Sequence, residues 1–210
     1  MELFFDSLRW IHVAAGFTGL VAFWIPIFTR KGGGNHVLYG KVFKYCAYFV
    51  LGMAGLSIGL RVPLAFAEGV TPITHPQNFS FLVFLGYLTL VTYIGMRHGF
   101  GVLRYKADIT RMNTGLNRGL AWTAIGSSVF LIAYAIIFSP PDMIVLYALS
   151  PIGFGTGFGI LGAIKNKQQQ KKAWFYEHMG AVPTGSVPSG SIPGRTLPCL
   201  VLELENSVTA

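Results

Sequence analysis

Charged residues are scarce in this sequence. Aspartate, glutamate, lysine and arginine make up 11% of its 210 residues, whereas a soluble domain averages roughly 25%. So little charge cannot cover the surface of a water-soluble globule. Apolar residues reach 52% and the mean hydropathy is +0.54. The composition therefore predicts a polytopic membrane protein, and it excludes an intrinsically disordered chain and a disulfide-stapled secreted domain.

Cysteines and acidic residues are also few. The two cysteines, Cys46 and Cys199, form no C-x-x-C motif, so neither a disulfide framework nor a thiolate metal site is indicated. None of the eight acidic residues lies in the middle of an apolar run, which argues against a carboxylate proton relay across a bilayer. No nucleophile–base motif stands out, so the sequence leaves open whether the chain is an enzyme.

Five apolar runs are long enough to cross a bilayer, which takes about 20 residues of helix. The second is expected to end at Arg61 and Pro63, and a flexible loop at Gly32–Gly34 is expected to precede it. The sequence thus predicts an all-α fold, a polytopic transmembrane helix bundle. The predicted spans are residues 8–28, 42–62, 79–99, 119–138 and 142–164.

Lysine and arginine concentrate in alternate connections between the predicted spans. Thirteen of the sixteen lie at one side of the predicted bundle, in the connections or adjoining span ends between spans one and two and between spans three and four, or just after span five. Arg9 and Arg61 lie on the other side, and Arg195 lies in the tail. The positive-inside rule then predicts an outside N-terminus and cytoplasmic basic connections. The net charge of +8 is best explained by anionic inner-leaflet lipids at these basic loops, and not by nucleic acid.

A sixth span begins at residues 173–180 and is then interrupted. Trp174 and Tyr176 are typical of the membrane interface, but prolines recur every five residues from Pro183 to Pro198 and no helix can continue through them. We therefore expect a transmembrane domain at residues 1–180, with an incomplete sixth helix, and a Pro/Gly/Ser-rich disordered tail at 181–210. The tail is either a natural extension or the product of a frameshift, and we favour the frameshift.

Five histidines are the main candidates for chemistry, because imidazole binds metals and carries protons near neutral pH. The predicted topology places His12 and His75 on the outer side. His36 follows the flexible glycine-rich loop, His98 ends the third span, and His178 begins the sixth segment. The sequence therefore predicts an outer pair and an inner group of three.

Two hypotheses explain these histidines. In one, they bind haem b or a metal ion, which requires imidazoles on facing helices with small residues nearby; Gly16 and Gly19 follow His12 at suitable spacing. In the other, which we favour, interfacial histidines only stabilise helix ends. Under the first hypothesis the cofactor ligands are His12, His98 and His178, and the candidate metal ligands are His36 and His75.

Glycines indicate how the spans pack. Gly55 and Gly59 form a G-x-x-x-G motif in the second span, and several glycines crowd the fifth. Small residues allow helix backbones to approach closely in lipid, where hydrophobicity cannot drive association. We therefore expect close helix contacts at Gly55 and in the fifth span.

Three motifs resemble a known family. They are His12 with Gly16, the segment 33–43 (Gly-Gly-Asn-His-Val-Leu-Tyr-Gly-Lys-Val-Phe), and the segment 174–179 (Trp-Phe-Tyr-Glu-His-Met). Over residues 8–180 the chain resembles a bacterial family of predicted membrane proteins, the domain-of-unknown-function family 2306. The resemblance implies a multi-pass inner-membrane protein with a complete final helix, and it implies no activity or cofactor. The chain departs from the family after Gly180.

The sequence thus favours a non-catalytic integral inner-membrane protein with structural histidines. The alternative is a haem- or metal-associated redox component.

Overall fold

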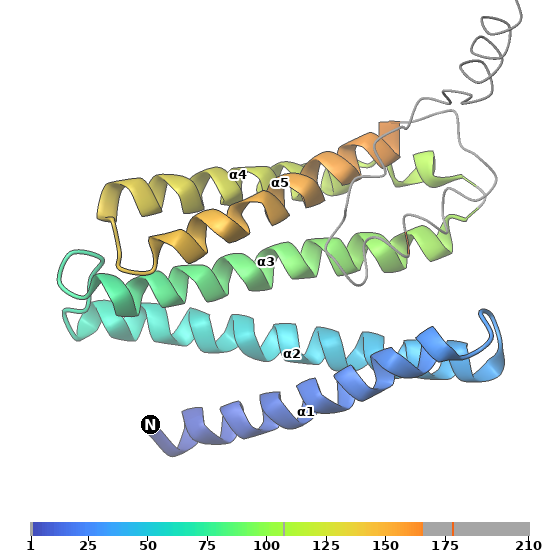
Figure 1. The fold of residues 1–210 in the computed structure, drawn as a ribbon, viewed down its shortest axis with the longest axis horizontal. Helices are drawn as coiled ribbons and strands as arrows, with labels where there is room; N and C mark the ends of the chain where they lie inside the picture. The colour runs from blue at the N-terminus through green and yellow to red at the C-terminus, as the bar shows by residue number, and fades with distance from the viewer. Residues whose placement is uncertain (1, 107, 166–177, 179–210) are drawn as a thin grey trace, which may run out of the picture.

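The structure is a computed structural model that describes residues 2–106, 108–165 and 178. The described chain folds into five long helices and one short 3₁₀ helix, η1 (Figure 1). All five long helices are apolar and long enough to cross a membrane, which confirms the predicted all-α transmembrane bundle. Their bounds are α1 Glu2–Phe28, α2 Gly34–Ala67, α3 Pro76–Arg104, η1 Ile109–Met112, α4 Gly115–Phe138 and α5 Met143–Lys165.

The second helix differs most from its prediction. It continues through Pro63 to Ala67, so the expectation that Pro63 ends it is wrong. Transmembrane helices tolerate an internal proline because other groups can satisfy the freed carbonyl. The helix ends instead where Gly69 adopts a φ of 75°, and the amide of Val70 then donates to the carbonyl of Ala65 at 2.8 Å. A glycine in the left-handed region is a common helix terminator.

The start of α2 also corrects a prediction. His36 lies in the first turn of α2, which begins at Gly34, so the second span starts before the predicted residue 42. The chain reverses direction over residues 29–33, where Gly32 has a φ of 79° and the amide of Gly33 donates to the carbonyl of Arg30 at 2.9 Å. The predicted partial helix at 173–180 and the tail at 181–210 lie outside the described residues, apart from His178.

The helices form two antiparallel hairpins with α3 between them. In Figure 1, α1 and α2 converge at the 29–33 connection and diverge toward the N-terminus, while α4 and α5 run side by side along the other face of α3. We call the end that holds residues 29–33, η1 and Lys165 the basic end. The N-terminal end holds the start of α1, the 68–75 connection and the 139–142 turn.

The buried core lies among α3, η1, α4 and α5. Two clusters of buried side chains follow one another along these elements, and neither includes a residue of α1 or α2. The first, toward the basic end, includes Ile94, Val102, Ile109, Ala121 and Ile164. The second, toward the N-terminal end, includes Phe79, Tyr87, Leu131, Tyr134 and Leu146.

Two glycines allow α4 and α5 to pack closely. A Cβ added at Gly157 would lie 2.6 Å from the carbonyl oxygen of Ala121, and one at Gly153 would lie 2.7 Å from that of Ala124. Neither position has room for a side chain, because backbone carbonyls of the facing helix obstruct it together with the side chains of Ser128 and Ile125. The predicted close packing of the fifth span is therefore confirmed at these two positions.

The G-x-x-x-G motif of α2 behaves differently. A Cβ added at Gly52, Gly55 or Gly59 would meet nothing within 4 Å, so the expected close contact at Gly55 is wrong. The facing side of α3 carries the larger side chains of Leu90 and Tyr93. Small residues permit a close approach but do not enforce one, and here bulk on the partner helix leaves open space.

A buried tyrosine joins α3 to α5 at a proline. The amide of Gly153 donates a hydrogen bond to the hydroxyl of Tyr87 at 2.8 Å. The same hydroxyl donates to the carbonyl oxygen of Leu149 at 3.0 Å. Gly153 and Leu149 are the pair that an uninterrupted helix would bond directly. Pro151 removes another helix donor, and the Ser150 hydroxyl donates to the carbonyl of Tyr147 at 2.9 Å.

Candidate functional site

A large cleft lies at the N-terminal end between α1, α2 and α3, with a volume of about 1060 Å³. We call it the Arg61 cleft. It forms where α1 diverges from α2 (Figure 1). The residues of α2 that line it recur every three or four positions, as expected for one face of a helix: Ala54, Ser57, Ile58, Arg61, Leu64, Ala65 and Glu68.

The Arg61 cleft carries charges of both signs. Arg9, His12 and Arg61 supply basic groups, and Glu68 and Asp142 supply carboxylates. Ionisable side chains near a bilayer are costly to bury and are commonly functional. Mixed charge at the end of an apolar bundle therefore marks this cleft as the candidate binding site.

Two of these charges are held in place by neighbours. Ser80 is fully buried. Its hydroxyl donates to the carboxylate of Asp142, whose two oxygens lie 2.7 Å and 3.0 Å away. On α1, the exposed guanidinium of Arg9 forms an ion pair with Asp6 at 2.9 Å, a contact worth little at a solvated surface. Asp142 is thus the better positioned of the two, since its partner lies in the core.

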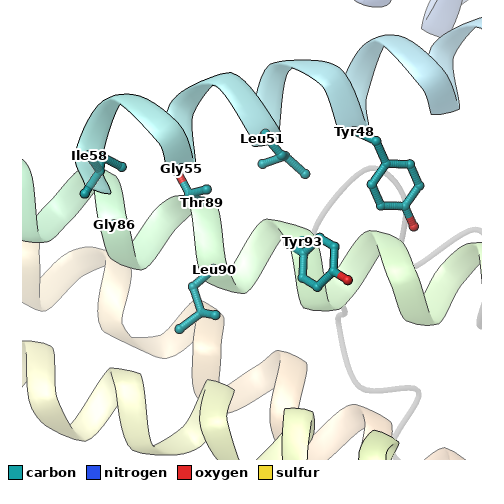
Figure 2. Close-up of a pocket in the computed structure, with 9 residues that line it drawn as sticks. Tyr48, Leu51, Gly55, Ile58, Gly86, Thr89, Leu90 and Tyr93 are labelled. Atoms are coloured by element: carbon teal, nitrogen blue, oxygen red, sulfur yellow. The ribbon is translucent and has the colours of Figure 1, made fainter. Parts of the chain in front are cut away.

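An apolar groove continues from the cleft along the seam between α2 and α3 (Figure 2). Its volume is about 380 Å³, and we call it the glycine groove. Figure 2 shows Ile58 and Gly86 at one end, and Tyr48 and Tyr93 at the other. The two tyrosine rings pack edge to face with centroids 6.1 Å apart. The lining residues are Tyr48, Leu51, Gly52, Gly55, Ile58, Gly86, Thr89, Leu90 and Tyr93.

Two histidines at the basic end contact backbone carbonyls. The Nδ1 atom of His36 lies 3.1 Å from the carbonyl oxygen of Pro26 in the last turn of α1. The Nδ1 atom of His178 lies 3.1 Å from that of Gly99, and its ring packs on Phe100 with centroids 6.1 Å apart. Terminal carbonyls of a helix lack partners within the helix, so the His36 ring supplies a donor to the end of α1.

Burial lowers the pKa of His178 below its ordinary value of 6.5. Removal from water disfavours the charged imidazolium. The hydrogen bond to Gly99 opposes this effect, whereas the positive charges of His36 and Lys106 add to it. The structure thus brings His36 and His178 close enough to interact electrostatically, as part of the expected inner group.

His98, the third member of the inner group, lies on a different face of α3 from the one that contacts His178. His98 is 4% exposed and is four residues from both Ile94 and Val102, whose side chains pack against η1, α4 and α5. Phe100, which contacts His178, is two positions further on and so is rotated by roughly 200° around the helix. This geometry does not support a pair of axial ligands made of His98 and His178.

The outer pair is also separated. His12 lines the Arg61 cleft, whereas His75 is exposed in the 68–75 connection and lies 3.1 Å from the Thr74 hydroxyl. Gly16 and Gly19 open onto a different hollow, between α1 and α2, that His12 does not line. Within the described residues, no three His, Cys, Asp or Glu side chains come together to hold a metal ion. Haem or metal binding by the histidines stays a prediction from the sequence.

Comparisons with known proteins give no relative: no family model, no curated protein and no solved structure matches the chain. The resemblance to the bacterial membrane-protein family therefore stays an expectation based on three short motifs.

Sequence reasoning missed most of the Arg61 cleft. Arg9 appeared only as an exception to the charge bias, Arg61 as an exception and as the end of a span, and Asp142 as the start of a span. A signal was nevertheless present, because these exceptions share one end of the bundle with Glu68. Charge that opposes the topological bias is costly at this location and indicates a specific role.

Proposed function

We propose that this chain is a non-catalytic integral protein of the bacterial inner membrane that binds a small zwitterionic ligand in the Arg61 cleft. The charge pattern of the cleft supports the proposal. Arg61 suits a phosphate-like anion, and the carboxylates of Glu68 and Asp142 suit an ammonium-like cation. A purely anionic ligand would be repelled by Glu68 and Asp142, and a purely cationic one by Arg61.

The contacts of the polar groups support a non-catalytic role. Ser80 and Asp142 resemble a nucleophile and base, but the Ser80 hydroxyl is fully buried and also donates toward the carbonyl of Gln77 at 2.9 Å. A nucleophile must reach a substrate. The contacts of His36 and His178 with backbone carbonyls favour structural roles for these rings.

The proposed orientation places the Arg61 cleft outside and the basic end in the cytoplasm, facing anionic lipids of the inner leaflet. Reporter fusions after Arg30 and Arg111 should read cytoplasmic, and one after Glu68 should read periplasmic. A periplasmic reading at either of the first two would overturn this orientation.

Binding can be tested with phosphoethanolamine, a soluble zwitterion. A ligand that binds only the folded state stabilises it by about 2.7 kcal/mol at 100 times its Kd. We expect phosphoethanolamine to raise the melting temperature of the purified protein in detergent. Arg61→Gln should abolish the rise and Arg104→Gln, at the basic end, should preserve it. An equal rise in both variants would contradict the proposal.

The same preparation tests the haem and metal hypothesis. We expect a visible spectrum without a reducible Soret band and no stoichiometric metal by elemental analysis. A Soret band that disappears in His12→Ala or His178→Ala would instead assign the histidines to a cofactor.

A further inference from the structure

The Arg61 cleft and the glycine groove form one continuous site. Ile58 lines both, and the lining residues of α3 pass from Leu82 and Leu85 in the cleft to Gly86 in the groove without a break. Positions 78, 82, 85, 89 and 93 are spaced as one face of a helix. A polar cleft at the bundle end therefore leads directly into an apolar channel along the helix seam.

We propose that this site binds one diacyl phospholipid with a phosphoethanolamine headgroup, with the headgroup in the cleft and one acyl chain in the groove. The inference rests on the proposed function and extends it, because it identifies the zwitterionic ligand as a membrane lipid of the leaflet that contacts the N-terminal end.

The length of the groove suits an acyl chain. From Ile58 to Tyr48 the helix advances ten residues, which is about 15 Å at 1.5 Å per residue. The hydrocarbon core of a bilayer is about 30 Å thick, so the groove extends across about one leaflet. Tyr48 and Tyr93 close its inner end.

The shape of the groove suits a hydrocarbon chain, since its volume of about 380 Å³ is spread along about 15 Å of helix. Glycines create this shape, because Gly52 and Gly55 leave open space where a Cβ would stand. The apolar lining gives water few partners.

The charges select the headgroup. A phosphate beside Arg61 would place a short linked ammonium group toward Glu68 or Asp142, all of which line the cleft. A phosphoglycerol headgroup carries the phosphate without the cation and offers no positive group to Glu68 or Asp142. The cleft therefore favours phosphatidylethanolamine over phosphatidylglycerol.

Lipid retention tests the inference. The protein is purified in mild detergent from membranes containing both lipids, and bound lipids are counted by native mass spectrometry. We expect about one phosphatidylethanolamine per wild-type chain, held at least fivefold over phosphatidylglycerol. Gly55→Leu should fill the groove and reduce retention at least fivefold. Gly126→Leu is the matched control, since Gly126 also faces open space but on α4, and it should retain lipid like the wild type.

Gly52→Leu provides a second groove variant if Gly55→Leu folds poorly, as judged by the melting temperature. Equal lipid retention in a folded groove variant and in the Gly126→Leu control would overturn the inference. Equal retention of phosphatidylethanolamine and phosphatidylglycerol by the wild type would overturn it as well. If soluble phosphoethanolamine stabilises the protein but lipid retention is unaffected by the groove variants, the proposed function stands and the lipid inference fails. If neither binds, both fail.

Discussion

The α1–α2 hairpin and the α3–α5 unit are equally apolar but differ greatly in packing. α2 has no buried residue along its 34 positions, whereas α3 has ten, α4 has seven and α5 has seven. Both regions carry glycines at helical spacing, yet Gly157 contacts a backbone and Gly55 contacts nothing. Lipid gives helices no hydrophobic reason to associate, so packing depends on matched shapes and polar contacts. The α4–α5 seam has both, whereas the glycine face of α2 leaves open space against α3.

The largest effect is expected from a single methyl group in the packed unit. Gly157→Ala places a Cβ 2.6 Å from the carbonyl oxygen of Ala121, and overpacking of this kind typically costs about 1–3 kcal/mol. Gly162→Ala is the control on the same helix, because a Cβ there meets nothing within 4 Å. Unfolding by SDS in mixed micelles measures both. Equal midpoints for the two variants would show that α4 and α5 are not in close contact.

Loss of the Tyr87 hydroxyl should have the next largest effect. Tyr87→Phe leaves the amide of Gly153 without its hydroxyl acceptor beside Pro151. Hydrogen bonds between transmembrane helices contribute up to about 1.7 kcal/mol, so we expect a loss of about 1–1.7 kcal/mol in the same assay. Tyr45→Phe, at a 70% exposed position on α2, should cost much less. If Tyr87→Phe unfolded at the same SDS concentration as the wild type, the hydrogen bond between Gly153 and Tyr87 would not contribute to stability.

The basic end should respond moderately to pH. Because the pKa of His178 is lowered in the folded state, its neutral ring contributes stability above pH 6.5, and this contribution is lost as the pH falls below 6.5. Imidazole NMR should give a titration midpoint for His178 below 6.5, and denatured protein should give one nearer 6.5. A folded midpoint at or above 6.5 would contradict the burial of the His178 ring.

The smallest effect is expected in the hairpin. Gly55→Leu should change the free energy of unfolding by no more than about 0.5 kcal/mol, the range of ordinary surface substitutions, because nothing lies within 4 Å of the added Cβ. Ala54→Leu on the same helix is the comparison. A loss near that of Gly157→Ala would mean that α2 packs as closely as α5, and the contrast between the two regions would disappear.

Much of the fold was predictable, but the candidate site was not. All five spans were found from apolar length, and the packing role of Gly153 and Gly157 from their residue type. The limits of α2 were missed at both ends, at His36 and at Pro63. Glycine and proline usually end a helix, but in a membrane the chain stays helical through them because unpaired backbone groups are costly there. The Arg61 cleft was missed because its lining comes from α1, α2, the 68–75 connection, α3 and the 139–142 turn, and these residues lie up to 134 positions apart, from Leu8 to Asp142.

The sequence by itself determined how many helices form and which loops carry positive charge, since both follow from short stretches of chain and their transfer from water to lipid. Only the tertiary structure decided which glycines pack and which leave space. It also decided which histidines approach each other and where charge of both signs meets. These outcomes depend on the shape of a partner helix at the same depth, and composition alone does not specify that partner.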